Sequence, residues 1–518
     1  MENSFNLLFE PWIDTIDFEG NIQSYGILEL LNNAHKLSEI CDTSPLMKYG
    51  VYRFLIAFVM DAFNISDTDD IDKIFDEKKF SSSVLETYCK SYTNRFYLFS
   101  QESPFYQNPK IIDNDEKNII EIFQFYFPKG NNTILTFHTL QNEYAFSPAI
   151  CAKALCSLSP FAIIAGRGYS SNINGKTPWY VLIKGKNLFE TLTLNCCGTP
   201  IDLNTGEQPV SWKLPNIEIN SSIQQVSTLQ GLTWIPRYIY LCLGNEGICS
   251  YSGRQSKILV SKVNFQQGWK FNGAWIDPHV SYILSKTGRY ALRPEIGKQL
   301  WRDIGPLMVP LTIISENTEN KIYQNPIVVQ QFHRFSLEKH LSDKYLFTIE
   351  VYGLNNDKAK FLECYSEKLT LPIIILKNQY KSKQIQPAID IANKVEFALK
   401  DAIKRFGSKS KGFQNLILNE YWTRLERLFK NWFLKELERQ DESDLNAAGK
   451  LHTDWRTNLK STGKDVLELF LSEMESNAEL LKIQVMIMDH YLKKVSYLLF
   501  PSDKNKAKKK SKNSKEVN

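Results

Sequence analysis

Apolar residues in the C-terminal part of the chain recur every three or four positions, the spacing of one face of an α-helix. The first such segment starts at Pro387 and ends at Gly407, a typical helix-terminating residue. The pattern returns in three more segments, which cover residues 413–439, 444–471 and 477–500. Long amphipathic helices with short links bury their apolar stripes against one another. The sequence therefore predicts a four-helix bundle over residues 376–500.

Residues 1–375 have a different character, because short strand-like runs alternate with helical patches and turn signals. The run 51–63 is typical of a buried helix, and 179–185 and 345–354 are typical of strands. Residues 354–360 form a polar turn between strand-like runs, and no repeat at a fixed period appears. We expect an α+β protein: a large, irregular mixed α/β N-terminal domain over 1–375, followed by the C-terminal four-helix bundle. A chain of 518 residues is long enough for two cores.

The charge is concentrated at the C-terminal end. The net charge is +5, and residues 501–518 hold seven lysines against two acids, so the first 500 residues are balanced. This composition predicts a disordered, Lys-rich tail. A protein that binds duplex DNA by itself usually presents a basic face, because phosphate neutralisation supplies most of its affinity. Any contact with nucleic acid should therefore occur at a few points or beside more basic partners.

The sequence favours a soluble, cytoplasmic protein without a membrane partner. The N-terminus lacks the basic residues of a signal peptide, and the longest apolar runs are shorter than a membrane-spanning helix. Nine scattered cysteines do not indicate a disulfide framework.

The segment 162–180, AIIAGRGYSSNINGKTPWY, resembles a phosphate-binding loop without matching one. FAIIA is strand-like and Gly175-Lys176-Thr177 has the correct ending, but six residues separate Gly168 from Gly175 where the motif has four. Pro178 then leads into a strand-like run instead of the required helix. A nucleotide-binding enzyme that uses this loop is one alternative.

Other catalytic and metal-binding patterns are missing from the sequence. The histidines are scattered, no GxSxG or HExxH occurs, and a structural turn accounts for Asp277-Pro278-His279. The Cys151/Cys156 and Cys242/Cys249 spacings are loose compared with zinc knuckles. We expect no catalytic residue, no metal and no cofactor.

Several segments in a fixed order resemble one known family. They are FNLLFEPWIDTIDFEGNIQSYGILELLNNAHKLSEI near the N-terminus, SPFYQNP (103–109), FHTLQNEYAFSPA (137–149), LFETLTLN (188–195), GLTWIPRYIYL (231–241), WIDPH (275–279) and LWRDIGPL (300–307). Together with the bundle, they are similar over nearly the full length to the large subunit (CasA) of the type I-E CRISPR surveillance complex, Cascade.

This resemblance implies a non-enzymatic subunit that recognises the protospacer-adjacent motif (PAM) of target double-stranded DNA from the minor groove. It would start the unwinding that lets the guide RNA form an R-loop, and base pairing with the guide would supply sequence specificity. The implied partners are other Cascade subunits, the CRISPR guide RNA, target DNA and a recruited helicase-nuclease, in antiviral defence. A purely structural subunit that clamps guide RNA is a further alternative.

The resemblance also assigns DNA-binding residues. Its glycine loop aligns with Gly166, Arg167 and Gly168, where the missing Cβ atoms let the backbone approach the groove floor. Arg167 interrupts the glycines, and it either enters the groove or faces solvent. The wedge hairpin aligns with Asn356 and Lys358, where Lys358 replaces the family's glutamine.

Three further assignments complete the set. Lys262 is the candidate for a lysine that contacts the PAM, with Lys257 as a competitor. Phe137 and His138 fall in a loop that touches the guide RNA and neighbouring subunits. Arg424 and Arg427, on the polar face of the second bundle helix, are the candidates for the displaced, non-target strand, and an ordinary solvated surface is the alternative interpretation.

Overall fold

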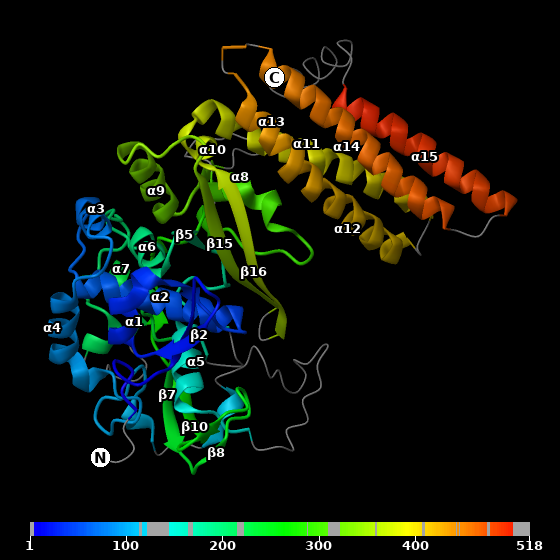
Figure 1. Cartoon of the computed structure of the whole chain (residues 1–518). Coiled ribbons are helices and arrows are strands. Elements are labelled where there is room, and N and C mark those ends of the chain that lie inside the picture. The colour runs from blue at the N-terminus through cyan, green and yellow to red at the C-terminus, as the bar shows by residue number, and fades with distance from the viewer. Residues whose placement is uncertain are drawn as a thin grey trace. The chain divides into compact units, whose positions relative to one another are not determined.

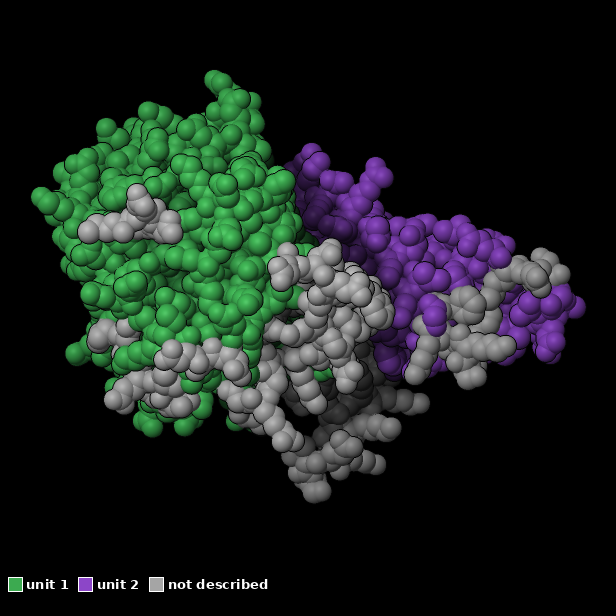
Figure 2. Space-filling model, turned by 90° about the horizontal axis from the view of Figure 1, so that it is seen from below, with its two compact units in different colours: residues 1–296, 321–371 green, residues 297–320, 372–518 purple. Residues whose placement is uncertain are grey.

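The computed structural model divides the chain into two compact units, which Figure 2 shows in green and purple. Unit 1 comprises residues 1–296 and 321–371, and unit 2 comprises residues 297–320 and 372–518. The structure describes residues 5–112, 116–121, 144–163, 169–214, 222–286, 288–308, 322–357, 360–406, 410–441, 443–444, 446–473 and 477–500. Within these ranges, every helix is too short or too polar to cross a membrane.

Unit 1 mixes helices with small sheets, as the sequence predicts. Its helices are α1 (Ile27–Asn33), α2 (Pro45–Ala62), α3 (Thr68–Asp76), α4 (Ser82–Tyr92), α5 (Pro148–Phe161), α6 (Leu188–Leu194), α7 (Thr228–Leu232) and α9 (Ile327–Glu338). Short 3-10 turns are η1 (Ala34–Lys36), η2 (Thr93–Arg95), η3 (Pro109–Ile111), η4 (Ile119–Glu121) and η6 (Ser211–Lys213).

The strands of unit 1 form several small sheets (Figure 1). Three-stranded sheets have the orders β2-β1-β3, β4-β10-β7, β13-β12-β14 and β16-β15-β5, and the pairs are β11-β6 and β8-β9. The bounds are β1 (Ile13–Asp17), β2 (Ile22–Tyr25), β3 (Leu37–Ile40), β4 (Lys117–Asn118), β5 (Tyr180–Lys184), β6 (Ser222–Ile223), β7 (Arg237–Leu243), β8 (Gly247–Ile248), β9 (Gln255–Ser256), β10 (Val260–Gln267), β11 (Lys270–Phe271), β12 (Tyr282–Ser285), β13 (Gly288–Ala291), β14 (Ile322–Gln324), β15 (Leu346–Asp357) and β16 (Lys360–Pro372).

Helix α2 is the predicted buried helix, and its residues are apolar on nearly every face. The Ser44 hydroxyl accepts a hydrogen bond from the Met47 amide (3.1 Å), and Pro45 occupies the first turn, where its missing N–H costs nothing. The helix packs against α5, which is buried along almost its whole length. The two helices therefore form the centre of the unit 1 core.

The predicted strands at 179–185 and 345–354 are confirmed as β5 and β15, which pair antiparallel. The expected turn at 354–360 starts later, because β15 continues to Asp357. Leu354 is buried, and the Asn355 side chain donates to the Pro294 carbonyl (3.2 Å), so tertiary contacts extend the strand.

The expected strand FAIIA is wrong in its described part. Phe161 ends α5, and residues 162–163 leave the helix without joining a sheet. An apolar run fits a buried helix as well as a buried strand, so periodicity alone does not separate the two.

A buried ion pair connects four parts of unit 1. Arg53 of α2 lies 2.8 Å from the Asp277 carboxylate, and both side chains are at most 1% exposed. The same guanidinium donates to the Leu232 and Gly231 carbonyls of α7 at 3.0 and 3.1 Å. The Asn174 amide donates to Asp277 at 3.0 Å. Burial raises the pKa of Asp277, but the Arg53 charge outweighs it and holds this pKa well below its usual range.

Unit 2 contains the predicted bundle, in which α11, α12, α14 and α15 pack side by side (Figure 1). Its helices are α8 (Ile304–Met308), α10 (Ile373–Lys377), α11 (Gln379–Ile403), α12 (Ser410–Leu428), α13 (Leu434–Arg439), α14 (Ala447–Ser472) and α15 (Ala478–Leu499). Shorter turns are η7 (Leu300–Asp303), η8 (Lys404–Phe406) and the π-helical turn η9 (Phe429–Phe433).

The first bundle helix begins earlier than the sequence pattern predicts. Asn378 caps α11 by accepting a hydrogen bond from the Lys381 amide (3.0 Å), and Pro387 lies inside the helix. Proline removes only one backbone donor, and buried residues on both sides of it, such as Ile385 and Ala388, hold the helix in the core.

The segment 297–308 also packs into the bundle. Trp301 stacks on Phe429 (ring centroids 4.8 Å), and the Arg302 guanidinium lies 3.5 Å above the Trp422 ring while it pairs with Glu396 at 2.9 Å. The sequence-based division places this segment in the N-terminal domain, whereas in the structure its contacts are with helices far downstream.

We expect Asp277→Ala to lower the free energy of unfolding of unit 1 by about 3–5 kcal/mol, because it leaves a buried guanidinium without its counterion. Asp76→Ala removes an exposed ion pair with Lys339 and should cost less than about 1 kcal/mol. Chemical denaturation followed by circular dichroism measures both, and equal losses would contradict the assigned role of Arg53–Asp277.

We also expect the bundle to lose stability below neutral pH through His452 of α14. Burial, assisted by Arg456, lowers the pKa of His452 from 6.5 to about 4. The unfolded chain therefore takes up this proton at a higher pH than the folded chain, and stability falls as the pH drops from 6.5 to 4. His452→Gln should flatten the melting temperature over this window, and an unchanged pH dependence would contradict the assignment.

Candidate nucleic-acid interface

The β4-β10-β7 sheet carries charged and polar groups that contact the described residues on either side of the predicted glycine loop. Side chains alternate between the two faces of a strand, so Val263, Phe265 and Gln267 of β10 share one face. The register places Lys117 of β4 opposite Val263 and Arg237 of β7 opposite Gln267, on the same face.

Arg237 joins the two chain segments that flank residues 164–168. Its guanidinium donates to the Ile163 carbonyl (2.7 Å) and to the Ser170 carbonyl. The neighbouring Gln267 amide oxygen accepts from the Ser170 backbone amide (2.5 Å). These bonds hold the entry and exit of the segment against one sheet.

The Arg237 guanidinium is buried, and no carboxylate within the described ranges pairs with it. Burial lowers its pKa to about 10. Its partners are carbonyl oxygens and the rings of Tyr169 and Phe265, whose centroids lie 5.3 and 5.9 Å away. A buried cation without a counterion is costly, and here carbonyl oxygens and aromatic rings compensate the charge of Arg237.

A second cation lies over the same rings. The Lys117 ammonium is 5.3 Å from the Phe265 centroid and 5.8 Å from the Tyr169 centroid. Lys262 occupies the alternate position on β10 and is therefore on the opposite face, where it is 60% exposed and pairs with Glu116 at 3.0 Å. Its competitor Lys257 is exposed just before β10.

Several sequence-based site residues lie outside the described residues. They are Gly166, Arg167, Gly168, Lys358, Phe137 and His138. Asn356 is described: it is half-buried near the end of β15. Strand β5 follows residues 169–178 in the chain and pairs with β15. This pairing connects the β15–β16 hairpin, which carries Asn356, to the residues that follow 164–168 in the sequence.

The geometry of residues 172–180 argues against a phosphate-binding loop. The Asn172 amide donates to the Ala162 carbonyl (2.8 Å), and Gly175 closes a turn with φ +75°. Thr177, whose hydroxyl a Mg²⁺ site requires, is buried. Strand β5 follows, so no helix N-terminus is available to bind phosphate there.

Arg424 and Arg427 line a groove on the bundle together with Trp432, between α12 and α14. The two arginines are therefore brought together with an aromatic side chain.

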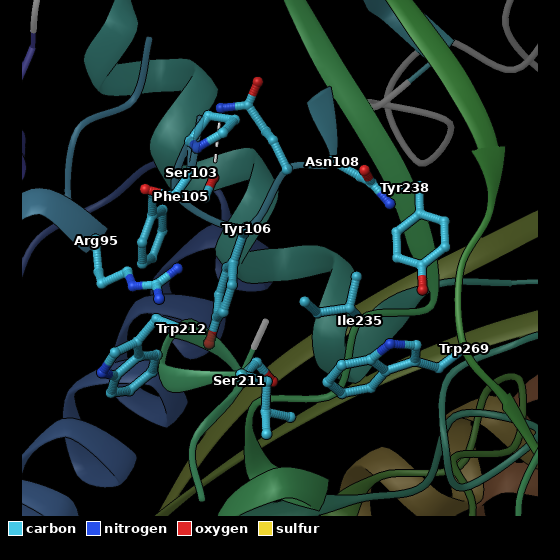
Figure 3. Close-up of a pocket in the computed structure, with 13 residues that line it drawn as sticks. Arg95, Ser103, Phe105, Tyr106, Asn108, Ser211, Trp212, Ile235, Tyr238 and Trp269 are labelled. Atoms are coloured by element: carbon cyan, nitrogen blue, oxygen red, sulfur yellow. Dashed lines mark hydrogen bonds between the residues drawn. The ribbon is translucent and has the colours of Figure 1, made fainter. Parts of the chain in front are cut away.

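Figure 3 shows a small cavity of about 40 Å³ in unit 1. Arg95, Phe105, Tyr106 and Trp212 line one part of it, and Asn108, Tyr238 and Trp269 line another. A cavity of this size holds roughly three water molecules. It is too small for a nucleotide, and it marks the packing of residues 103–109 against residues 234–241.

Metal ligands do not converge within the described residues, and three buried cysteines are held in the thiol form. Within them, no three His, Cys, Asp or Glu side chains converge as metal ligands. Burial raises the pKa of Cys151, Cys156 and Cys196, so these thiols stay protonated. The Asp277-Pro278-His279 pairing is structural: the His279 amide donates to Asp277 (3.0 Å) and its Nε2 lies 3.0 Å from the Asn195 carbonyl.

Sequence reasoning missed Arg237, Lys117, Tyr169 and Trp432 as candidate site residues. Arg237 opens a strand that is otherwise apolar, and a lone cation in such a run is the available signal for a buried polar anchor. Tyr169 and Trp432 carried no signal, since aromatic residues usually belong to a core.

Comparison with known proteins gives one consistent family. The family model of CRISPR-associated protein Cse1 matches residues 6–466. The CRISPR-associated protein CasA/Cse1 of Thermus thermophilus is 25% identical over 416 residues, which cover 76% of each chain. The solved structure of Thermus thermophilus CasA (Cse1) has a TM-score of 0.73 at 19% identity, covering 95% of this chain and 99% of that one. A chain of a CRISPR RNA-guided surveillance complex has a TM-score of 0.70 at 16% identity, covering 94% and 99%.

Arg237→Met should loosen the segments that flank residues 164–168, because it removes the donor shared by Ile163 and Ser170 while keeping the apolar stem. We expect hydrogen exchange of the Ser170 and Asn172 amides to accelerate about tenfold or more, the equivalent of one lost hydrogen bond. Arg254→Met, at an exposed position of the same unit, is the control. Unchanged exchange in Arg237→Met would show that the guanidinium does not hold these segments.

Proposed function

The chain belongs to the Cse1 (CasA) family, the large subunit of type I-E Cascade, and on this premise we propose that it recognises the PAM of target double-stranded DNA from the minor groove. It would then start the duplex unwinding that precedes R-loop formation. The family match over residues 6–466 is the observation that carries the proposal.

The glycine segment is the proposed reading element. Gly166 and Gly168 would bring the backbone close to the groove floor, where a donor or acceptor on the main chain distinguishes A·T from G·C. The Arg237 clamp supports this role, because it fixes both ends of the segment, and a pre-organised loop loses less conformational entropy on binding. Arg167 would enter a narrow minor groove, where the negative potential favours arginine.

The β15–β16 hairpin is the proposed wedge. Asn356 lies near the end of β15, Lys358 follows it in the sequence, and the long strands β15 and β16 give the hairpin a rigid base. Lys358 would insert below the PAM and pair with phosphate, without reading a base edge. The pairing of β15 with β5 supports a concerted action of wedge and glycine segment.

The remaining assignments concern assembly. Phe137 and His138 would contact the guide RNA and a neighbouring Cascade subunit, Lys262 would add a contact to the PAM duplex, and Arg424 with Arg427 would contact the displaced strand. The subunit would be non-enzymatic and would recruit a helicase-nuclease that degrades the DNA. The balanced charge of residues 1–500 supports a reader that works beside more basic subunits.

Reconstituted Cascade with and without this chain tests the function. At one stated salt concentration, we expect Lys358→Ala and Gly168→Asp each to weaken binding of a PAM-bearing duplex about tenfold, which corresponds to one charge-assisted contact of about 1.4 kcal/mol. Assembly with guide RNA should be unchanged in both variants.

Matched controls separate the site from general charge effects. Lys344→Ala removes an exposed lysine just before β15, and Ser83→Asp adds an acid at the exposed start of α4. Neither should change duplex binding. The complex could instead need this chain for guide-RNA assembly and bind PAM-bearing and PAM-lacking duplexes equally. That result would favour the structural, RNA-clamping alternative.

A further inference from the structure

A groove of about 400 Å³ lies on the surface of unit 2, between α12 with its π-helical extension η9 and α14. One wall consists of Arg424, Arg427, Leu428, Asn431 and Trp432, and the other carries Thr462 and Asp465. This volume lies within the roughly 300–1,000 Å³ of typical ligand sites. The groove is therefore large enough for a single nucleotide.

The two arginines of the basic wall have N–H groups that are not used in contacts with the described residues. Arg427 is exposed and has neither an ion pair nor a hydrogen bond among the described residues. Arg424 pairs through Nε with Glu420 at 2.7 Å, which leaves its two terminal amino groups without a partner in the same part of the chain. Positions 424, 427 and 431 follow helical spacing, so Asn431 adds a polar side chain to the same stripe.

Trp432 provides a flat surface that is held in place from behind. Its ring is half-buried and stacks on Trp455 with centroids 6.1 Å apart and planes 12° apart. Trp455 is fully buried and donates to the Ala388 carbonyl (3.0 Å), so the stack has a rigid support. Trp432 is also one of the residues that line the groove.

The π-helical turn η9 is the local feature that accompanies this arrangement. Phe429 and Phe433 of the turn are fully buried, whereas Trp432 between them is not. π-Helical turns are rare and recur at functional sites, because they interrupt the regular helix ladder. Here the interruption coincides with the tryptophan that lines the groove.

Asp465 on the facing wall restricts the class of ligand. An exposed carboxylate repels a simple anion but accepts a hydrogen bond from an N–H group. A ligand that satisfies all parts of the groove has an anionic end for the arginines and a planar end with an N–H donor. An unpaired nucleotide has both, whereas the bases of a duplex are stacked and cannot reach Trp432.

We propose that this groove binds one unpaired nucleotide of a DNA single strand, with the base on Trp432, its donor edge at Asp465 and the flanking phosphates at Arg424 and Arg427. The inference rests on the proposed function, which supplies a displaced strand. It adds Trp432, Asn431 and Asp465 to a surface that sequence reasoning described only as basic.

Fluorescence anisotropy of the full-length chain with a labelled 12-mer of oligothymidylate tests the base contact. Trp432→Ala should weaken binding roughly fivefold to 150-fold, the range for loss of one base stack, and Trp432→Phe should lose less. An abasic 12-mer of equal charge should bind wild type and Trp432→Ala equally. Melting temperatures of both variants report whether the bundle stays folded.

Salt titration tests the phosphate contact. Arg427→Gln should reduce the slope of log affinity against log salt by about 0.7, the value for one phosphate of a single strand. Lys493→Gln, which removes an exposed cation of α15 that pairs with Asp489, is the matched control and should leave the slope unchanged.

Asp465→Ala separates base recognition from simple charge attraction. The inferred site loses affinity for oligothymidylate with this variant, because thymine N3–H loses its acceptor. A site that only attracts phosphate would instead gain affinity. Gain of affinity in Asp465→Ala, or equal affinity in wild type and folded Trp432→Phe and Trp432→Ala, would overturn the inference.

The outcome is independent of PAM recognition. Gly168→Asp should leave single-strand binding unchanged, and Trp432→Ala should leave the PAM preference of the reconstituted complex unchanged. Loss of subunit assembly in Trp432→Ala with unaltered strand binding would show that the groove holds a protein partner and would also overturn the inference.

Discussion

The buried ion pair between Arg53 and Asp277 determines how the elements of unit 1 meet. A guanidinium and a carboxylate without access to water stay charged only while each has its partners, so α2, α7 and the 277 loop are held in one arrangement. Asn174 adds the turn before β5 to this cluster, and the Tyr180 hydroxyl joins it to the end of α5 through the Pro160 carbonyl (2.9 Å). The two ends of the segment at 164–168 are thereby tied to the core.

Arg237 completes this arrangement from the other side. Its guanidinium donates to the carbonyls of Ile163 and Ser170, which flank residues 164–168. This cation is buried, and its partners among the described residues are carbonyl oxygens and aromatic rings. Because β5 leaves this region and pairs with β15, the same constraint continues into the hairpin. Two proposed DNA contacts, the glycine segment and the wedge, therefore depend on one continuous set of backbone contacts.

In unit 2, one run of aromatic residues supplies both the core of the bundle and a side chain at its surface. The aromatic seam of Trp301, Phe429, Phe433 and Trp455 holds the bundle together. Trp432 belongs to the same run of residues, but the π-helical turn leaves it half-buried at the rim. Helical periodicity predicts the buried aromatic seam. It does not predict that Trp432 stays half-buried, because it assumes a regular α-helix throughout.

Other differences between expectation and structure have equally local causes. The helix α11 continues through Pro387 because flanking buried side chains offset one lost backbone bond. Of the described residues of the apolar run FAIIA, only Phe161 lies in a helix, at the end of α5, which packs against α2, and residues 162–163 join no sheet. Lys262 and Lys117 are both lysines of neighbouring strands, and their sequence context does not separate them. Strand alternation and register place them on opposite faces of one sheet.

The sequence by itself determined the helical bundle, the mixed α/β character of unit 1, the main strands and the family, because these depend on periodicity, composition and the order of segments over long stretches. Tertiary structure alone decided that residues 297–308 pack with the bundle, that Arg237 clamps residues 163 and 170, and that Trp432 meets Arg427 and Asp465 across a groove. Each of these contacts joins residues far apart in the chain or on different elements. Their distance in space depends on how the elements pack, and no local pattern in a single sequence records it.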